Sequence, residues 1–372
     1  DNRKTRKVTD DAVYDLASVS KATGTLPAVM KAYDDGLIQL NNTISTYVPA
    51  LRGSNKSDFT VEELLYHQSG ITPYIAFYQN ARADRGYMCD DGTTQCTDTS
   101  RNALPASSLH TSSMGPSWLS DSPKPGYMTE IAKRMYVHDS FRDRIMQDIR
   151  NSRLGARGKY TYSCINFILL KMAVEHVTRR PMDQLLNAHF FSRLGATSTT
   201  YNPLRKMDTL RIVPTEDDRV MRHQILRGYV HDEAAALQGG VSGNAGLFSS
   251  ADDLAKLLQL YLNDGSYGGE PYISALTCHM FTHSQSRASR RGLGFDRPDH
   301  APGKASPCGR LAPASVYGHT GFTGTCFWVD PDNRIIYIFL SNRVHPSRDN
   351  NKLSTLGIRS RIQDAIYKAL KK

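Results

Sequence analysis

The chain has 372 residues, of which 40% are hydrophobic and 22% charged, a composition typical of globular proteins. This length allows one large domain or two closely packed ones with a sizeable core. The net charge is +10, but lysine and arginine are scattered without a dense basic run or an aromatic RNA-binding motif, which argues against nucleic acid as a partner. No apolar run approaches the roughly 18 residues that a membrane-spanning helix needs.

The first residues, "DNRKTRKVTD", contain neither an initiator methionine nor a signal peptide. We therefore expect a processed or trimmed piece of a longer polypeptide. The six cysteines form no C-x-x-C pair, which argues against a structural zinc site or a thioredoxin-type motif. Cys89 and Cys96 flank a polar stretch and are either a loop-closing disulfide or two free surface thiols.

The first helix is predicted to start at Ser18 and to end at Gly36, with a kink or break at Pro27. A second, short helix is predicted to follow Thr60, because Glu63 stands three residues later and the pair forms a capping box.

Residues 84–126 are rich in Ser, Thr, Gly, Asp and Pro and are predicted to form a long, irregular surface excursion. Helical patterns follow over residues 129–155 and 164–180. A further helix is predicted after Ser249, which makes a second capping box with Asp252.

Near the end the pattern changes to strands. Residues 324–343 predict a hairpin, and apolar residues at helical spacing predict a last helix over 353–370. Together these elements predict an α+β fold in one unit. Residues 1–50 and 270–372 would form an α/β sheet subdomain, and residues 51–269 a mostly helical one.

Ser18 and Lys21 share a helix face if the stretch "SVSK" is helical. They are either a nucleophile with its base or a helix cap and a solvated lysine. The catalytic interpretation requires burial to lower the pKa of Lys21 toward neutrality.

Two later segments carry further candidates. Tyr162, just before an apolar helix, is either a proton shuttle beside a cationic lysine or a core aromatic residue. His319-Thr320-Gly321 stand at the entrance to the predicted hairpin. There Gly321 allows a backbone to approach a ligand and the N–H of Phe322 could face a bound carbonyl, although a glycine-rich turn explains the segment equally well.

Taken in order, Ser18-Val19-Ser20-Lys21, Tyr162-Ser163-Cys164 and His319-Thr320-Gly321 resemble the motifs S-x-x-K, Y-x-N and K/H-T-G. These motifs mark the penicillin-recognising serine hydrolases, which include class C β-lactamases, D-alanyl-D-alanine carboxypeptidases and their esterase relatives. The stretches "LLYHQSGI" and "GGVSGNAGLFSSADDLAKL" also resemble segments of that family, and the resemblance runs from Tyr14 to about Ser341.

The resemblance implies a β-lactamase-like sandwich, in which helices flank an antiparallel sheet and a mostly helical subdomain is inserted. Only 17 residues precede Ser18, so the first strands of the family's sheet are expected to be missing. We therefore expect a module of a larger chain, and the resemblance suggests a glycosidase-containing polypeptide as one parent.

The resemblance also implies roles. Ser18 would be acylated, Lys21 and Tyr162 would move the proton, and the N–H groups of Ser18 and Phe322 would form the oxyanion hole. The implied substrate-binding residues are Cys164, His319, Thr320 and Gly321. No metal or cofactor is implied. The implied substrates are small molecules or peptidoglycan fragments: peptides ending in D-alanine, small esters or β-lactams, met in the periplasm or at the cell surface.

Two positions depart from the family pattern. Cys164 stands where dedicated β-lactamases carry Asn, and a thiol is a weak donor and acceptor, so we expect poor β-lactam turnover and less effect on esters. His319 replaces the usual Lys, so a cation there would be lost as pH rises and carboxylate recognition would weaken above neutral pH. A catalytically weak or inactive domain that binds cell-wall fragments is the alternative.

Other candidate sites are weaker. His279 and His283 stand at helical i, i+4 spacing beside Cys278, but without a following Glu or a third ligand they do not predict a metal site. "GGVSGNAG" lacks the ending of a phosphate-binding loop and predicts a tight turn near the site. His231-Asp232-Glu233 are either a dyad or a loop near the substrate groove.

Overall fold

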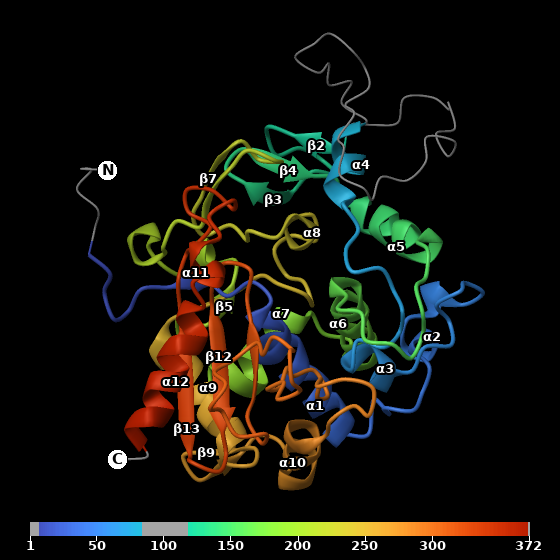
Figure 1. The fold of residues 1–372 in the computed structure, drawn as a ribbon. Coiled ribbons are helices and arrows are strands. Elements are labelled where there is room, and N and C mark those ends of the chain that lie inside the picture. The colour runs from blue at the N-terminus through green and yellow to red at the C-terminus, as the bar shows by residue number, and fades with distance from the viewer. Residues whose placement is uncertain (1–6, 84–117, 371–372) are drawn as a thin grey trace.

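The computed structural model describes residues 7–83 and 118–370 (Figure 1). Its α-helices are α1 (Leu26–Asp34), α2 (Ile44–Tyr47), α3 (Val61–Leu65), α4 (Phe77–Ala83), α5 (Phe141–Asn151), α6 (Cys164–Thr178), α7 (Met182–Leu186), α8 (Glu233–Ala236), α9 (Ala251–Leu262), α10 (Ala275–His283), α11 (Lys352–Thr355) and α12 (Ile358–Leu370). Within these described ranges, no helix combines the length and the apolar character needed to cross a membrane.

The strands are short and lie in several small sheets. They are β1 (Tyr14–Asp15), β2 (Leu119–Ser120), β3 (Thr129–Ala132), β4 (Met135–Val137), β5 (Thr200–Tyr201), β6 (Glu216–Asp218), β7 (Gln224–Leu226), β8 (Leu247–Ser249), β9 (Ser266–Tyr267), β10 (Glu270–Pro271), β11 (Tyr317–Thr320), β12 (Cys326–Asp330) and β13 (Ile335–Phe339). The mixture of helices and antiparallel sheets confirms the predicted α+β class.

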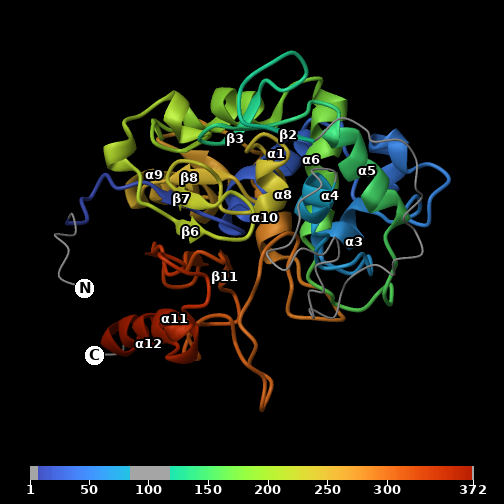
Figure 2. The same ribbon diagram turned by 90° about the horizontal axis from the view of Figure 1, so that it is seen from above.

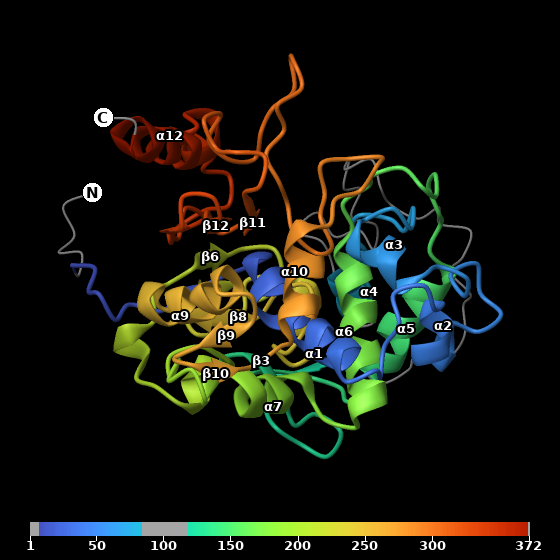
Figure 3. The same cartoon turned by 90° about the horizontal axis from the view of Figure 1, so that it is seen from below.

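The C-terminal sheet has the order β11-β12-β13 and is antiparallel throughout. Its hairpin is the predicted one, closed by Asp330, whose carboxylate accepts a hydrogen bond from the backbone N–H of Asn333 at 3.0 Å. Helix α9 contacts β12 and β13. A separate small core, which contains Trp328, Tyr337 and Tyr367, joins α12 to the same sheet. Helices α11 and α12 therefore lie on the side away from the main body, as Figures 2 and 3 show.

The first helix begins directly after β1, which pairs with β8 in a second sheet of order β1-β8-β5. A π-helical segment, Lys21–Thr25, precedes α1, and Pro27 occupies the first turn of α1. A proline fits there because the first N–H groups of a helix have no intrahelical acceptor. The predicted break near Pro27 is thus a change of helix type, with the chain continuing in the same helix.

The capping box of Thr60 and Glu63 at the start of α3 is confirmed. The second predicted box is wrong by one residue. Ser250 caps α9 by accepting a hydrogen bond from the N–H of Asp253, because Ser249 is still paired in strand β8.

The helix predicted over residues 129–155 is wrong in its first half, where β3 and β4 form a hairpin before α5 begins at Phe141. The buried side chains Ile131 and Val137 direct this segment toward the main core. Cys89 and Cys96 lie outside the described residues.

Candidate active site

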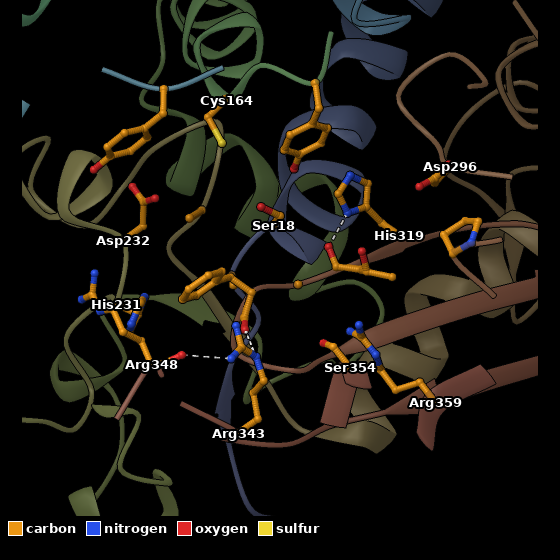
Figure 4. A pocket seen from close by; sticks show the side chains of 18 of the residues that line it. Ser18, Cys164, His231, Asp232, Asp296, His319, Arg343, Arg348, Ser354 and Arg359 are labelled. Atoms are coloured by element: carbon orange, nitrogen blue, oxygen red, sulfur yellow. Dashed lines mark hydrogen bonds between the residues drawn. The ribbon is translucent and has the colours of Figure 1, made fainter. Parts of the chain in front are cut away.

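Ser18 lies at the turn between β1 and the first helix, where Figure 4 shows it at the centre of a pocket. The preceding residue, Ala17, has φ of +47°, a left-handed conformation that is uncommon for a residue with a side chain. Asp15 holds this turn, because its Oδ1 accepts the N–H of Ala17 at 2.8 Å. The main-chain oxygen of Ser18 accepts the N–H of Lys21 at 3.0 Å, so the helix starts immediately after the serine.

Lys21 is completely buried and directs its ammonium at three acceptors. Its Nζ lies 2.9 Å from Ser18 Oγ, 2.9 Å from the main-chain oxygen of Asn244 and 3.5 Å from Cys164 Sγ. Nζ also lies 5.1 Å from the ring centroid of Tyr162. The solvated-lysine interpretation is therefore wrong, and S-x-x-K forms a buried hydrogen-bonded pair.

Tyr162 comes from the segment just before α6 and meets this pair from the opposite side, where its hydroxyl interacts with both Lys21 and Ser18. Its ring packs against the buried imidazole of His67 at a centroid distance of 4.6 Å. The N–H of Ser163 donates to His67 Nδ1 at 3.1 Å. His67, from the "LLYHQSGI" stretch, thus positions the tyrosine segment.

The protonation of the Lys21–Tyr162 pair differs from the expectation. Burial lowers the pKa of Lys21, but the negative charge that Cys164 and Tyr162 carry once deprotonated outweighs it and raises that pKa above its usual value. Burial also raises the pKa of Tyr162, against the opposing effect of the ammonium. The expected lowering of the Lys21 pKa toward neutrality is therefore wrong, and the resting pair holds both protons at neutral pH.

Cys164 begins α6 and lines the pocket beside Ser18. Burial raises the pKa of its thiol, so it is neutral and a weak partner for Lys21. The side chain of Asn244 interacts with the same sulfur and is oriented by Ser242, whose hydroxyl donates to its Oδ1 at 2.8 Å. The amide of Asn244 therefore lies behind Cys164, but it is buried and does not line the pocket, so the thiol is the group that the cavity presents here.

The N–H groups of Ser18 and Phe322 have no protein acceptor among the described residues. The loop that carries Phe322 packs directly on the nucleophile turn, because Thr325 Oγ1 donates to the main-chain oxygen of Leu16 at 2.9 Å. Gly321 is required for this approach, since a Cβ there would lie 2.2 Å from Thr325 Oγ1 and 2.6 Å from that same oxygen. The two free N–H groups are available for an oxyanion.

His319 lies on β11 and is buried. Its Nδ1–H donates to the carbonyl of Thr320 at 2.7 Å, so Nε2 is the unprotonated nitrogen and accepts from Arg291 at 3.4 Å. Burial and the charges of Arg291 and Lys21 lower its pKa to about 3. The predicted loss of a His319 cation near neutral pH is therefore wrong, because the imidazole is already neutral and the positive charge belongs to Arg291. That guanidinium pairs with Asp296 at 2.9 Å.

The pocket has a volume of about 640 Å³ and is lined by Ser18, Tyr162, Cys164 and the segment 319–322, together with charged groups from distant segments. Lys21 is buried beneath Ser18 and does not line it. Arg343 and Arg359 line the wall below Ser18 in Figure 4 and form no ion pair with an acid in the described part of the chain. Burial and the charge of Arg359 lower the pKa of Arg343, as expected for two cations side by side. Arg343 also stacks on Phe322, with its guanidinium carbon 4.5 Å from the ring centroid.

His231-Asp232-Glu233 line the opposite wall of the same pocket, and the dyad interpretation is wrong. His231 Nε2 pairs with Glu216 at 2.7 Å, and Glu233 pairs with Arg348 at 2.9 Å. Asp15 also holds this loop, because its Oδ2 accepts the N–H of His231 at 2.7 Å. One buried carboxylate therefore links both walls.

His279 and His283 lie on α10 away from this pocket, and their rings stack at a centroid distance of 3.7 Å. No group of three His, Cys, Asp or Glu side chains within residues 7–83 and 118–370 is placed to hold a metal ion.

Sequence reasoning missed several residues that line the pocket or lie behind its wall. Asn244 stands in the glycine-rich stretch taken for a tight turn, and a polar residue there was a usable signal. The arginines Arg291, Arg343, Arg348 and Arg359 had no such signal, because 46 lysines and arginines are spread over the chain and nothing local distinguishes these four.

The chain is similar to known proteins over most of its length. The family model "Beta-lactamase" matches residues 1–358. A protein of Escherichia coli strain K12 named "Putative D-alanyl-D-alanine carboxypeptidase" is 30% identical over 392 residues, covering 98% of this chain and 79% of that protein. 

Two solved structures are similar in fold. A class C β-lactamase from Rhodobacter sphaeroides superimposes with a TM-score of 0.58 at 18% identity, covering 94% of this chain and 85% of that one. EstCE1, described as a hydrolase with promiscuous acyltransferase activity, gives a TM-score of 0.60 at 18% identity, covering 99% of this chain and 88% of that one. The family-model match and the bacterial relative together establish that the chain belongs to the Beta-lactamase family.

Proposed function

We propose that this protein is a serine hydrolase that forms and hydrolyses an acyl-enzyme on Ser18. The observation that carries the proposal is the 2.9 Å hydrogen bond from the buried Lys21 Nζ to Ser18 Oγ, where Ser18 lines a cavity of about 640 Å³. A buried lysine beside a serine hydroxyl, with a tyrosine on its other side, is an arrangement suited to proton transfer during acylation.

The reaction proceeds in two halves. The Lys21–Tyr162 pair, after losing one proton to solvent, takes the proton of Ser18 while Oγ attacks the substrate carbonyl. The N–H groups of Ser18 and Phe322 stabilise the resulting oxyanion. The pair then gives the proton to the leaving group, whose bond to the carbonyl carbon breaks. Water repeats the same steps on the ester and releases Ser18.

Peptides that end in D-alanine are the proposed substrates, and small esters and β-lactams are alternative acylating agents. The name of the bacterial relative supports the peptide, as do Arg343 and Arg359, which can pair with a terminal carboxylate on the leaving-group side. Such substrates are peptidoglycan fragments, so we place the reaction in the periplasm or at the cell surface. Cys164 offers no amide to the acylamide of a β-lactam, which favours slow turnover of these compounds.

Intact-mass analysis tests the acyl-enzyme. The folded protein, incubated with a fluorescent penicillin or with a phosphonate ester, is expected to gain one adduct, and peptide mapping should place it on Ser18. The Ser18→Ala variant is the control and should gain none. A folded wild-type sample without an adduct would overturn the proposal and leave a domain that binds cell-wall fragments without turnover.

Substrate assays then distinguish a carboxypeptidase from an esterase. Release of D-alanine from a peptide, at a higher kcat/KM than p-nitrophenyl ester hydrolysis, supports the carboxypeptidase assignment. Ester hydrolysis without D-alanine release contradicts it and assigns the protein to the esterases.

A further inference from the structure

The pocket wall on the Cys164 side carries a carboxylate that the proposed reaction does not use. Asp232 stands immediately before α8, and Figure 4 shows its carboxylate directed into the space beside Cys164 and Ser18. It is close enough to raise the pKa of Lys21. Asp232 therefore lies on the Cys164 side of Ser18, away from Arg343 and Arg359 in Figure 4. The family resemblance implies that the acyl part of a substrate lies on the Cys164 side.

Every charged neighbour of Asp232 has another partner. Glu233 pairs with Arg348, His231 pairs with Glu216, and the hydrogen bonds of Lys21 go to Ser18, Cys164 and Asn244. No lysine, arginine or histidine of the described segments forms an ion pair with Asp232 itself. One oxygen, Oδ1, accepts the N–H of Ala235 and caps α8, which leaves Oδ2 directed at the cavity.

Two tyrosines complete this corner. Tyr74 and Tyr78, from the segment around the start of α4, line the same cavity. Tyr74 is 38% exposed; partial burial and the charge of Asp232 raise the pKa of its phenol, which therefore stays neutral. Neutral aromatic rings beside a carboxylate attract an ammonium group through both the ring quadrupole and the charge. We call Asp232, Tyr74 and Tyr78 the ammonium corner.

The position of the corner relative to Ser18 restricts which cation it can hold. An α-amino group is attached to the carbon next to the attacked carbonyl, so it lies on the acyl side, close to the nucleophile. An acylated nitrogen would bring an amide oxygen toward the Asp232 carboxylate and find only the neutral Cys164 thiol as a partner. The same space suits a free, protonated amine.

We propose that the ammonium corner binds the free amino group of the substrate's acyl part, so that the enzyme prefers aminoacyl substrates to their N-acylated counterparts. The inference rests on the proposed hydrolysis at Ser18 and narrows the D-alanine-ended substrates to those whose acyl residue keeps a free amino group, such as D-alanyl-D-alanine, in preference to longer peptides. Asp232 is its specificity-determining residue.

Kinetics with a matched substrate pair test the preference. Wild-type enzyme is expected to hydrolyse D-alanine p-nitroanilide with a kcat/KM at least tenfold above that of N-acetyl-D-alanine p-nitroanilide. Asp232→Asn keeps the helix cap, because Asn caps as well as Asp. It should lower kcat/KM about tenfold for the free amine and less than twofold for the N-acetyl compound. Asp208→Asn, at a capping aspartate outside the cavity, is the control. An equal loss on both substrates, or no loss on either, overturns the proposal.

A binding measurement separates this inference from the proposed reaction. The Ser18→Ala protein, which cannot be acylated, is titrated by calorimetry with D-alanyl-D-alanine and with its N-acetyl derivative. We expect the free dipeptide to bind about tenfold more tightly, and the difference to vanish when Asp232→Asn is added. This result would uphold the corner even if Ser18 formed no adduct. Equal affinities, or no binding of either peptide, overturn it even if Ser18 is reactive.

Discussion

At Lys21, burial and the neighbouring groups act on the same ammonium in opposite directions. Burial disfavours the charge, whereas Cys164 and Tyr162 favour it and prevail. The motif S-x-x-K predicts that the two side chains meet, and they do. It does not predict protonation, because that depends on groups more than 140 residues away in the sequence.

The pH dependence of catalysis follows from these directions. A base whose pKa is raised is protonated at neutral pH and becomes active only as pH rises through that pKa. Because the pKa values of both Lys21 and Tyr162 are raised, we expect kcat/KM to increase from pH 7 upward, with one apparent pKa that belongs to the pair. Stopped-time assays between pH 5 and 10 measure kcat/KM as a function of pH. A rate that is flat or falls above pH 7 contradicts it.

Cys164 provides a second test at the scale of one residue. The Lys21–Cys164 contact is 3.5 Å long and involves a neutral thiol. Cys164→Asn supplies an amide oxygen for Lys21 and an N–H for a substrate acylamide, each worth about 1 kcal/mol. We expect nitrocefin turnover to rise roughly five- to thirtyfold, according to whether one or both hydrogen bonds form in the transition state. Cys164→Ser, which is smaller and lacks the amide, is the control, and a gain in both variants would point to removal of the thiol rather than to the amide.

Among the elements, the loop after β11 determines whether an oxyanion hole exists. It brings Phe322 against the turn before Ser18 and is held there by Thr323 and Thr325, whose hydroxyls donate to the main-chain oxygens of Asp15 and Leu16. Glycine at 321 is the condition for this contact.

Gly321→Ala is therefore expected to displace the loop, because Leu16 O belongs to the backbone and cannot yield without moving the nucleophile turn. Loss of one oxyanion donor lowers kcat by about 10²–10³-fold. Gly155→Ala is the control, since a Cβ there meets only an ordinary contact at 3.5 Å. Circular dichroism should show both variants folded. Full activity of Gly321→Ala would exclude Phe322 as a donor.

Elements were predictable from the sequence where the signal is local. The hairpin turn at residues 330–333 and the capping box of Thr60 and Glu63 both depend on residues that lie within four positions of one another in the sequence. The segment Thr129–Val137 was not predictable, because its strands are specified by packing against the main core rather than by periodicity.

At the scale of the molecule, ion pairs around β6 join the middle of the chain to its C-terminal part. Glu216 pairs with His231 and Arg348, and Asp218 pairs with Arg222 at 2.6 Å, with both acids buried. The main-chain N–H of Arg348 also donates to Glu216. The network therefore fastens the segment that carries Arg343 against the wall that carries Asp232.

Protonation of Glu216 and Asp218 at low pH should break these ion pairs and lower the stability of the protein. Burial raises the pKa of Glu216, but His231 and Arg348 outweigh it and lower that pKa to about 2; for Asp218, Arg222 likewise lowers it to about 2. Because both pKa values lie below those of the unfolded chain, the stabilisation is complete above about pH 4.5 and is lost as pH falls toward 2. We expect the free energy of unfolding to drop by on the order of 2 kcal/mol per group in urea titrations.

Glu216→Gln tests whether Glu216 causes this fall in the free energy of unfolding as the pH is lowered. The variant is less stable at pH 7, because Arg348 loses one of its two carboxylate partners and keeps only Glu233, but its stability should change less between pH 5 and 2. If the free energy of unfolding of the variant falls as steeply with pH as that of the wild type, other carboxylates cause the acid sensitivity.

Asp15 contacts both the segment that determines reaction rate and the segment that determines substrate choice. One oxygen sets the turn before Ser18, the other sets the loop that presents Asp232, and its main-chain oxygen receives Thr323 from the oxyanion loop. A replacement at this position alters reaction rate and substrate choice in a single mutational step. Variants selected for a new acyl group should therefore accumulate changes at Asp232, Tyr74 or Cys164 and retain Asp15 throughout the selection.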